Sequence, residues 1–120
     1  DEAEEKNMKA WRLFVGEWKT VSPDGSAGGV AVAKTKSGCI TFQAKDLTLV
    51  LGWDTRAKVV KSVGLNTETG VVDDTWKLVG DGPRFEGHTE DGTKLSIQFT
   101  SKDRYELMVG DAKTIGERVK

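Results

Sequence analysis

The chain has 120 residues, with 18 lysine and arginine residues against 19 aspartate and glutamate residues and a formal net charge of −1 at pH 7. This balance gives no long-range field to attract nucleic acid, and no apolar run approaches the roughly 18 residues of a membrane-spanning helix. The single cysteine, Cys39, excludes an internal disulfide, and the length suits one domain over residues 1–120.

The N-terminal segment predicts a short helix near residues 5–15. The first nine residues are charged and polar, and Met8, Trp11 and Phe14 follow at a spacing of three. This spacing is the pattern of one apolar helical stripe. After Gly16 the helical period disappears.

From Gly16 onward the chain has the punctuation of an all-β domain. Turn signals such as those at 23–25, 81–83 and 91–92 recur about every eight to twelve residues. They predict about ten strands, over residues 16–22, 28–36, 39–44, 47–53, 57–64, 72–80, 84–89, 93–100, 104–109 and 113–119. The connections are too short for crossover helices, so neighbouring strands are expected to pair antiparallel. We predict a ten-stranded antiparallel meander barrel, because closure removes unpaired strand edges, with a two-sheet sandwich as the alternative.

Alternation of apolar and polar residues assigns the faces of the strands. Leu95, Ile97 and Phe99 alternate with polar residues, which predicts that they point inward. The same pattern places these residues inside: Ile40, Phe42, Leu47, Leu49, Leu51, Trp53, Trp76, Leu78, Tyr105, Leu107 and Val109. Around Val59, Val60 and Val63 the phase is ambiguous, because both faces carry valine and lysine.

The inward aromatic residues are the candidate ligand-binding residues. They either contact a ligand or simply fill the interior of a small barrel. The candidates are Trp18, Phe42, Trp53, Trp76, Phe85, Phe99, Tyr105 and Arg118. Only Arg118 and Lys61 are cations expected near the interior. An acidic ligand would need such a charge, so we expect neutral or weakly polar apolar ligands to be favoured.

Several short motifs carry a family resemblance. They are Phe14-Val15-Gly16-Glu17-Trp18, Gly52-Trp53-Asp54, Lys58-Val59-Val60, Asp103-Arg104-Tyr105 and Glu117-Arg118. The first resembles the opening motif of the calycins, the group of lipocalins and fatty-acid-binding proteins. Together they resemble small bacterial lipocalin-like domains, which are typically exported. The resemblance spans nearly the whole chain.

This resemblance implies a structural role for two residues. In the calycin pattern the tryptophan packs across the closed end of the barrel, as expected here for Trp18, and a basic residue lies over its ring, as expected for Arg118. Such a cation–π contact contributes about 0.5–2 kcal/mol. The chain lacks room for the two lid helices of fatty-acid-binding proteins, so a fatty acid is not implied. The resemblance, and a chain that begins at Asp1, lead us to expect a periplasmic or extracellular protein.

No cluster of residues suggests catalysis, a metal or a cofactor. His88 is the only histidine and is expected to point outward into solvent, which makes a haem-binding barrel a remote alternative. Asp73 and Asp74 are expected to face opposite sides of a strand as solvated carboxylates. Phosphate loops, nucleophile elbows and paired metal ligands are absent from the sequence. We therefore expect no cofactor and no enzyme, and an enzyme stays a remote alternative.

The sequence leaves two main hypotheses open. The first is a noncatalytic barrel that binds a small apolar or amphipathic ligand inside. The second is a filled structural barrel whose surface contacts a protein partner. The volume of an interior cavity separates them.

Overall fold

The computed structural model describes residues 1–21, 27–80 and 83–120, and these form a helical segment followed by ten β-strands. The helical segment is α1 (Glu2–Trp11) followed by the 3₁₀ turn η1 (Arg12–Phe14). The strands are β1 (Gly16–Val21), β2 (Ala27–Lys36), β3 (Cys39–Gln43), β4 (Leu47–Asp54), β5 (Val59–Asn66), β6 (Gly70–Leu78), β7 (Arg84–His88), β8 (Lys94–Ser101), β9 (Arg104–Val109) and β10 (Ala112–Arg118). The predicted turn at 23–25, and most of that at 81–83, lie outside the described residues.

The helical segment overlaps the helix predicted near residues 5–15, but α1 begins earlier, at Glu2. The carboxylate of Asp1 accepts a hydrogen bond from the Ala3 N–H (2.9 Å), which caps the helix N-terminus, and three glutamates in the first turn complement the helix dipole. Met8, Trp11 and Phe14 are all buried. The predicted apolar stripe is therefore confirmed.

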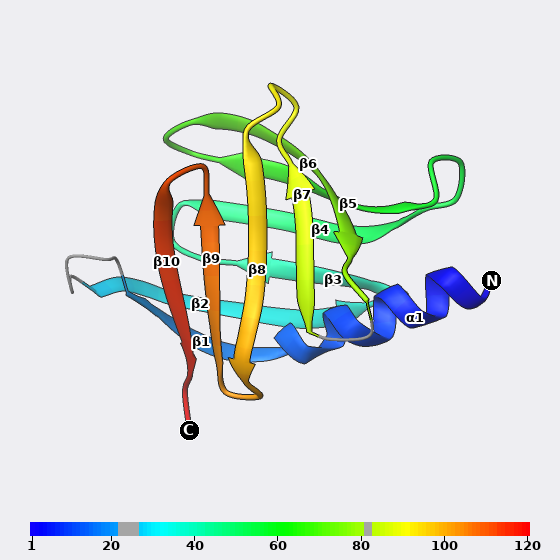
Figure 1. The fold of residues 1–120 in the computed structure, drawn as a ribbon. Helices are drawn as coiled ribbons and strands as arrows, with labels where there is room; N and C mark the ends of the chain where they lie inside the picture. The colour runs from blue at the N-terminus through cyan, green and yellow to red at the C-terminus, as the bar shows by residue number, and fades with distance from the viewer. Residues whose placement is uncertain (22–26, 81–82) are drawn as a thin grey trace.

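The strands pair antiparallel in sequence order, and β1 pairs with β10 to close the barrel (Figure 1). Closure places Trp18 directly opposite Arg118 in the β1–β10 register. The predicted ten-stranded meander barrel is confirmed, and the sandwich alternative is wrong because the sheet has no open edge.

Strands β5 and β6 are each displaced by two residues from the predicted ranges 57–64 and 72–80. Before β5, the Asp54 carboxylate accepts hydrogen bonds from the backbone N–H groups two and three residues on (2.9 and 3.1 Å). After β5, the Asn66 side chain makes the same pattern of bonds (2.9 and 3.2 Å). These two side-chain caps set the turns, and thereby the strand ends, where strand propensity alone leaves them free.

The face of β5 that the sequence left ambiguous is settled by its register. Val60 pairs with Trp76 of β6 and is fully buried, and Ser62 is buried on the same inward face. Val63 is 44% exposed on the outer face. The even-numbered residues of β5 therefore point into the barrel.

A glycine allows a large side chain to lie inside the barrel wall. Gly116 pairs with Tyr105 in the β9–β10 register. A Cβ atom at Gly116 would lie only 2.1 Å from a ring carbon of Tyr105. The phenol ring therefore occupies the space that any side chain at Gly116 would need.

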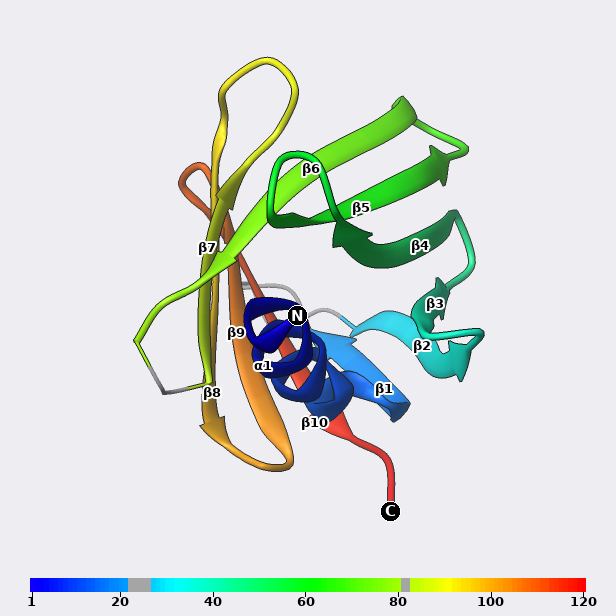
Figure 2. The same cartoon turned by 90° about the vertical axis from the view of Figure 1, so that its right-hand side faces the viewer.

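Helix α1 covers one end of the barrel. In Figure 2, which looks along the helix, α1 lies between the strands β7–β9 and the strands β1–β3. It contacts β4 and β6. Helix α1 is thus a cap on the barrel end, which we call the closed end.

Within the described part of the chain, no helix has the length and apolar character needed to cross a membrane.

Candidate functional site

The barrel encloses a cavity of about 800 Å³. Its floor includes Trp11 and Phe14, the residues that the helical segment inserts at the closed end. Its rim includes Ala44, Thr69 and Asp91, which come from the turns β3–β4, β5–β6 and β7–β8. The cavity therefore runs along the barrel from the helix to a mouth ringed by turns.

The wall of the cavity is mainly apolar. Inward residues of five strands contribute aliphatic and aromatic surface: Phe42, Leu49, Leu51, Trp76, Leu95, Ile97, Tyr105 and Leu107. Val109 was predicted to point inward and does line the cavity, although it is 42% exposed because it lies at the mouth. Polar residues also belong to the lining, among or above this apolar surface. A wall of this composition suits the burial of an apolar molecule.

Below the cavity, the closed end is filled by six aromatic side chains that we call the aromatic plug: Trp11, Phe14, Trp18, Phe85, Phe99 and Tyr105. The ring centroids of Trp11 and Phe85 are 4.1 Å apart, and those of Phe14 and Phe99 are 4.8 Å apart in an edge-to-face arrangement. Such contacts between aromatic rings add about 0.5–1.5 kcal/mol per pair beyond burial alone. The plug is therefore core, and its upper surface is the cavity floor.

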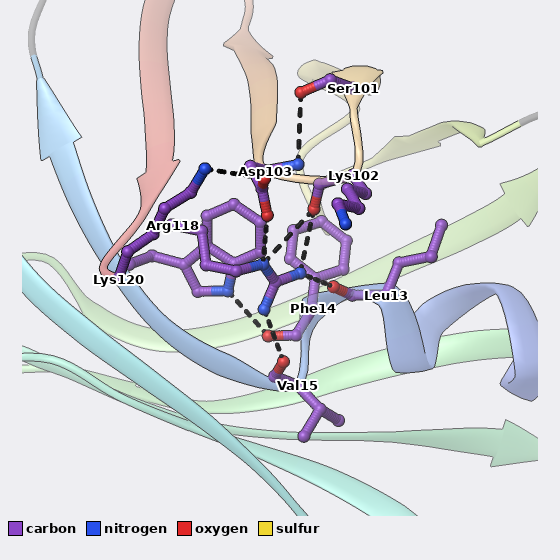
Figure 3. Close-up of polar contacts among 9 residues, drawn as sticks. Leu13, Phe14, Val15, Ser101, Lys102, Asp103, Arg118 and Lys120 are labelled. Atoms are coloured by element: carbon purple, nitrogen blue, oxygen red, sulfur yellow. Dashed lines mark hydrogen bonds and ion pairs between the residues drawn. The ribbon is translucent and has the colours of Figure 1, made fainter.

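Trp18 and Arg118 hold the closed end together, and Figure 3 shows the polar contacts of Arg118. Trp18 is 1% exposed, and its indole N–H donates a hydrogen bond to the Phe14 carbonyl (2.8 Å). The Arg118 guanidinium lies over the Trp18 ring, 4.3 Å from its centroid. The expected packing of Arg118 over Trp18 is confirmed.

The same guanidinium ties the helical segment to the barrel. It donates hydrogen bonds to the carbonyls of Leu13 (2.8 Å), Val15 (2.9 Å) and Lys102 (3.0 Å), and it forms an ion pair with Asp103 (3.1 Å). These acceptors come from the end of the helical segment, from Val15 directly after it, and from the β8–β9 turn. Because the planar guanidinium carries several donors, a single side chain satisfies carbonyls of both segments.

The glycine of the Gly16-Glu17-Trp18 motif also serves Arg118. Gly16 has φ +137°, which disfavours any other residue, and a Cβ atom there would lie 2.5 Å from Nη1 of Arg118. The glycine therefore leaves space for the guanidinium, and the tryptophan provides the ring beneath it. The glycine and the tryptophan of the motif therefore stabilise the closed end and do not line the cavity.

Acidic side chains gather at the upper wall and the mouth. Asp91 accepts hydrogen bonds from the hydroxyl of Thr89 and from the backbone N–H of Thr93 (3.2 Å), and these bonds lower the pKa of its carboxyl. Glu90, its neighbour, also lines the cavity. The mouth therefore carries an ionised carboxylate, that of Asp91, at neutral pH.

Asp73 and Asp74 face opposite sides of β6, as predicted, but neither is fully solvated. Asp73 forms an ion pair with Lys61 on the neighbouring strand (2.5 Å). Asp74 pairs in register with buried Ser62 and lines the cavity. Burial, with a further contribution from the nearby Asp73 charge, raises the pKa of the Asp74 carboxyl. The expectation of two solvated carboxylates is wrong, because the inward face of β6 at Asp74 is the wall of a cavity.

The eight candidate ligand-binding residues separate into three groups. Phe42, Trp76 and Tyr105 line the cavity. Trp18, Phe85 and Phe99 pack in the aromatic plug below it. Trp53 packs against the core from β4, and Arg118 lies at the closed end. Lys61, the other cation expected near the interior, does not line the cavity. It forms an ion pair with Asp73 and donates a hydrogen bond to the Thr75 hydroxyl.

Most lining residues were not among the candidates, and Trp11, Phe14, Ser62 and Asp74 are examples. The helical stripe identified the first two as buried, but a local pattern does not show that the helix covers the barrel end. The register of β5 against β6, which the sequence left open, was needed to place Ser62 inward.

The other groups weighed for chemistry remain apart from the cavity. His88 is exposed, as predicted, and does not line the cavity, so it offers no inward ligand for a haem iron. Among residues 1–21, 27–80 and 83–120, no group of three or more His, Cys, Asp or Glu side chains is arranged to hold a metal ion.

Tyr105, the one tyrosine of the chain, allows the cavity wall to be monitored directly. Burial raises the pKa of its phenol to about 12 from the ordinary value of 10. Ultraviolet absorbance of tyrosinate should therefore titrate near pH 12 in the folded protein and near pH 10 in urea. Because the folded pKa is the higher one, burial of this phenol stabilises the fold below pH 10, and that contribution is lost as the pH rises toward 12. A midpoint near 10 in protein that remains folded would contradict the placement of Tyr105.

No protein-family model matches this chain, and a search of curated proteins found no match. The calycin resemblance stays a prediction that rests on the sequence motifs.

Proposed function

We propose that this protein is a noncatalytic binding protein that takes a small apolar or amphipathic molecule into the barrel. The observation that carries the proposal is the cavity of about 800 Å³ with a mainly apolar wall. Cavities that bind small molecules commonly measure about 300–1,000 Å³ and combine apolar walls with a few polar groups. The exported location that the calycin resemblance implies belongs to the same proposal.

The extent of the aromatic plug supports this proposal over a filled structural barrel. Trp11 and Phe14 close the interior at one end, while Phe42, Trp76 and Tyr105 border space above them. Side chains that only completed a core would be expected to fill that space, because protein interiors are close-packed. Asp73 and Asp74 point to opposite sides of β6, so these two carboxylates do not face each other as a catalytic acid and base would. This arrangement supports a noncatalytic function.

A second candidate function, contact with a protein partner, draws on the outer surface. Val50 and Val63 are paired neighbours on β4 and β5, and they are 42% and 44% exposed. Leu65, two residues on from Val63, is 51% exposed. These residues form a small apolar area on the outside of the barrel, although single exposed apolar residues are common.

A dye titration tests the proposed function. N-phenyl-1-naphthylamine is uncharged at pH 7 and fluoresces in apolar surroundings, so it should bind saturably at a single site. Leu49→Trp should weaken this binding about tenfold or more, because the larger side chain enters the cavity. Val50→Trp is the matched control on the same strand, since Val50 faces outward, and it should bind the dye normally.

Folding of both variants is checked by far-ultraviolet circular dichroism, and Leu49→Phe gives a milder occlusion if Leu49→Trp does not fold. Equal loss of dye binding in the Leu49 and Val50 variants would place the dye on the outer surface. Folded protein without saturable dye binding would overturn the proposal and favour the partner-contact function.

A further inference from the structure

The charges on the cavity wall all have one sign. Four carboxylates belong to its lining, Asp73, Asp74, Glu90 and Asp91, although Asp73 faces the outer side of β6, and the described lining residues include no lysine, arginine or histidine. Asp73 is neutralised by its ion pair with Lys61. The other three carboxylates have no ion pair among the described residues. In a cavity with low-dielectric walls such charges produce a negative potential that attracts cations and repels anions.

Asp74 is the carboxylate set deepest along β6. Its side chain is half-buried, and it lies one inward step toward the mouth from Trp76 on the same strand. Among the described residues it has neither a hydrogen bond nor an ion pair. Burial raises the pKa of this carboxyl, which means that the folded protein makes its charged form costly. A cation in the cavity would stabilise the charged carboxylate and so offset this desolvation energy.

Ser62 provides a second polar group beside Asp74. The two residues are register partners on β5 and β6, and both line the cavity. Ser62 is 3% exposed, and its hydroxyl oxygen accepts one hydrogen bond from the Trp76 indole N–H (3.0 Å). In the part of the chain that the structure describes, the hydroxyl makes no other hydrogen bond. A second lone pair of the oxygen is therefore available to a donor inside the cavity.

The same contact fixes an apolar surface next to these polar groups. The hydrogen bond to Ser62 holds the Trp76 ring, which is 5% exposed and lines the cavity. The apolar wall continues with Leu51, the register partner of Ser62 on β4, and with Leu95 and Ile97 on β8. An amphipathic molecule would thus have its apolar body below and its polar end at the level of Asp74 and Ser62.

We infer that the ligand is an apolar molecule with a protonated amine, and that Asp74 and Ser62 hold its ammonium group. This inference rests on the proposed function and specifies its ligand class. An ammonium donates hydrogen bonds and accepts none, so it matches a carboxylate and a hydroxyl oxygen with a free lone pair. It replaces the expectation of a neutral ligand, which counted inward cations but not inward carboxylates.

Three ligands of equal chain length test the inference by displacement of N-phenyl-1-naphthylamine at pH 7, below the concentrations at which they form micelles. Decylamine is cationic, 1-decanol is neutral and decanoate is anionic. Decylamine should displace the dye at a concentration about tenfold lower than decanol, as expected for one close ion pair, and decanoate should be the weakest. Added salt should weaken decylamine but not decanol.

The variant Asp74→Asn should abolish the advantage of decylamine over decanol while dye binding stays within about twofold of the unaltered protein. Glu117→Gln is the matched control, because Glu117 is exposed, does not line the cavity and changes the net charge equally. If Asp74→Asn does not fold, the inference is still tested by the order in which the three ligands displace the dye from the unaltered protein.

Equal displacement by the three ligands, or a decylamine advantage that persists in Asp74→Asn, would overturn the inference while leaving the proposed function intact. Failure of the dye itself to bind would overturn the proposed function instead. The two failures are therefore distinguishable.

Discussion

Replacement of Trp18 by alanine is expected to lower the free energy of unfolding by about 3–5 kcal/mol. The indole is 1% exposed and packs edge-to-face against Tyr105 (5.0 Å between centroids). Its N–H bonds the Phe14 carbonyl, and its other face supports the Arg118 guanidinium. The substitution removes this burial, leaves a cavity in the plug and leaves a buried carbonyl without its donor. Urea unfolding followed by circular dichroism measures the change.

The control is His88→Ala, which should change the free energy of unfolding by less than about 0.5 kcal/mol, because His88 is exposed. Arg118→Ala should be intermediate, since it removes the cation–π contact and the hydrogen bonds but keeps the aromatic plug. Equal destabilisation by Trp18→Ala and His88→Ala would mean that the closed end is not packed as described.

The architecture was predictable because several local signals agree. Alternation in Leu95, Ile97 and Phe99 depends only on which face of a strand meets water, and all three are buried. Short connections require neighbouring strands to pair antiparallel, and a row of such strands removes its edges by closing. The displaced ends of β5 depend on the side-chain caps Asp54 and Asn66, and hydrophobic pattern carries no information about those bonds.

The candidate site was less predictable, because an inward residue can belong either to a plug or to a cavity wall. Phe85 and Phe42 both point inward, yet Phe85 lies beneath Trp11 and Phe42 borders open space. Which of the two applies depends on the position of a residue along the barrel axis, and hence on strand register and on the helix. Alternation gives only the side of the sheet.

Asp74 was misjudged for a related reason. The sequence places Asp73 and Asp74 on opposite sides of a strand, and this pattern alone does not show that the inward side borders a cavity. The cavity allows Asp74 to point inward and remain partly hydrated. A polar residue at an inward position of an alternating strand is thus a signal of a cavity, and β6 carries it in Asp74 followed by Trp76.

The largest expected effect outside β1 concerns the helical segment: Trp11→Ala should lower the free energy of unfolding by about 3–5 kcal/mol. Trp11 is 1% exposed, and its ring centroid lies 4.1 Å from that of Phe85 and 5.3 Å from that of Trp76. It joins α1 to two strands of the barrel. Loss of the indole would open the cavity floor and release the helix, which chemical denaturation and helix circular dichroism both record.

Trp11→Phe tests how much of the lost stability comes from the aromatic contact with Phe85, because phenylalanine keeps a ring at this position. The Trp11 indole N–H is buried and has no hydrogen-bond partner among the described residues, so phenylalanine keeps an aromatic ring on Phe85 and removes an unsatisfied donor. It should therefore recover more than half of the stability lost in Trp11→Ala. Leu13→Ala, in the same segment but 37% exposed, should cost about 1 kcal/mol. If Trp11→Ala is no more destabilising than Leu13→Ala, the helix does not close the barrel as described.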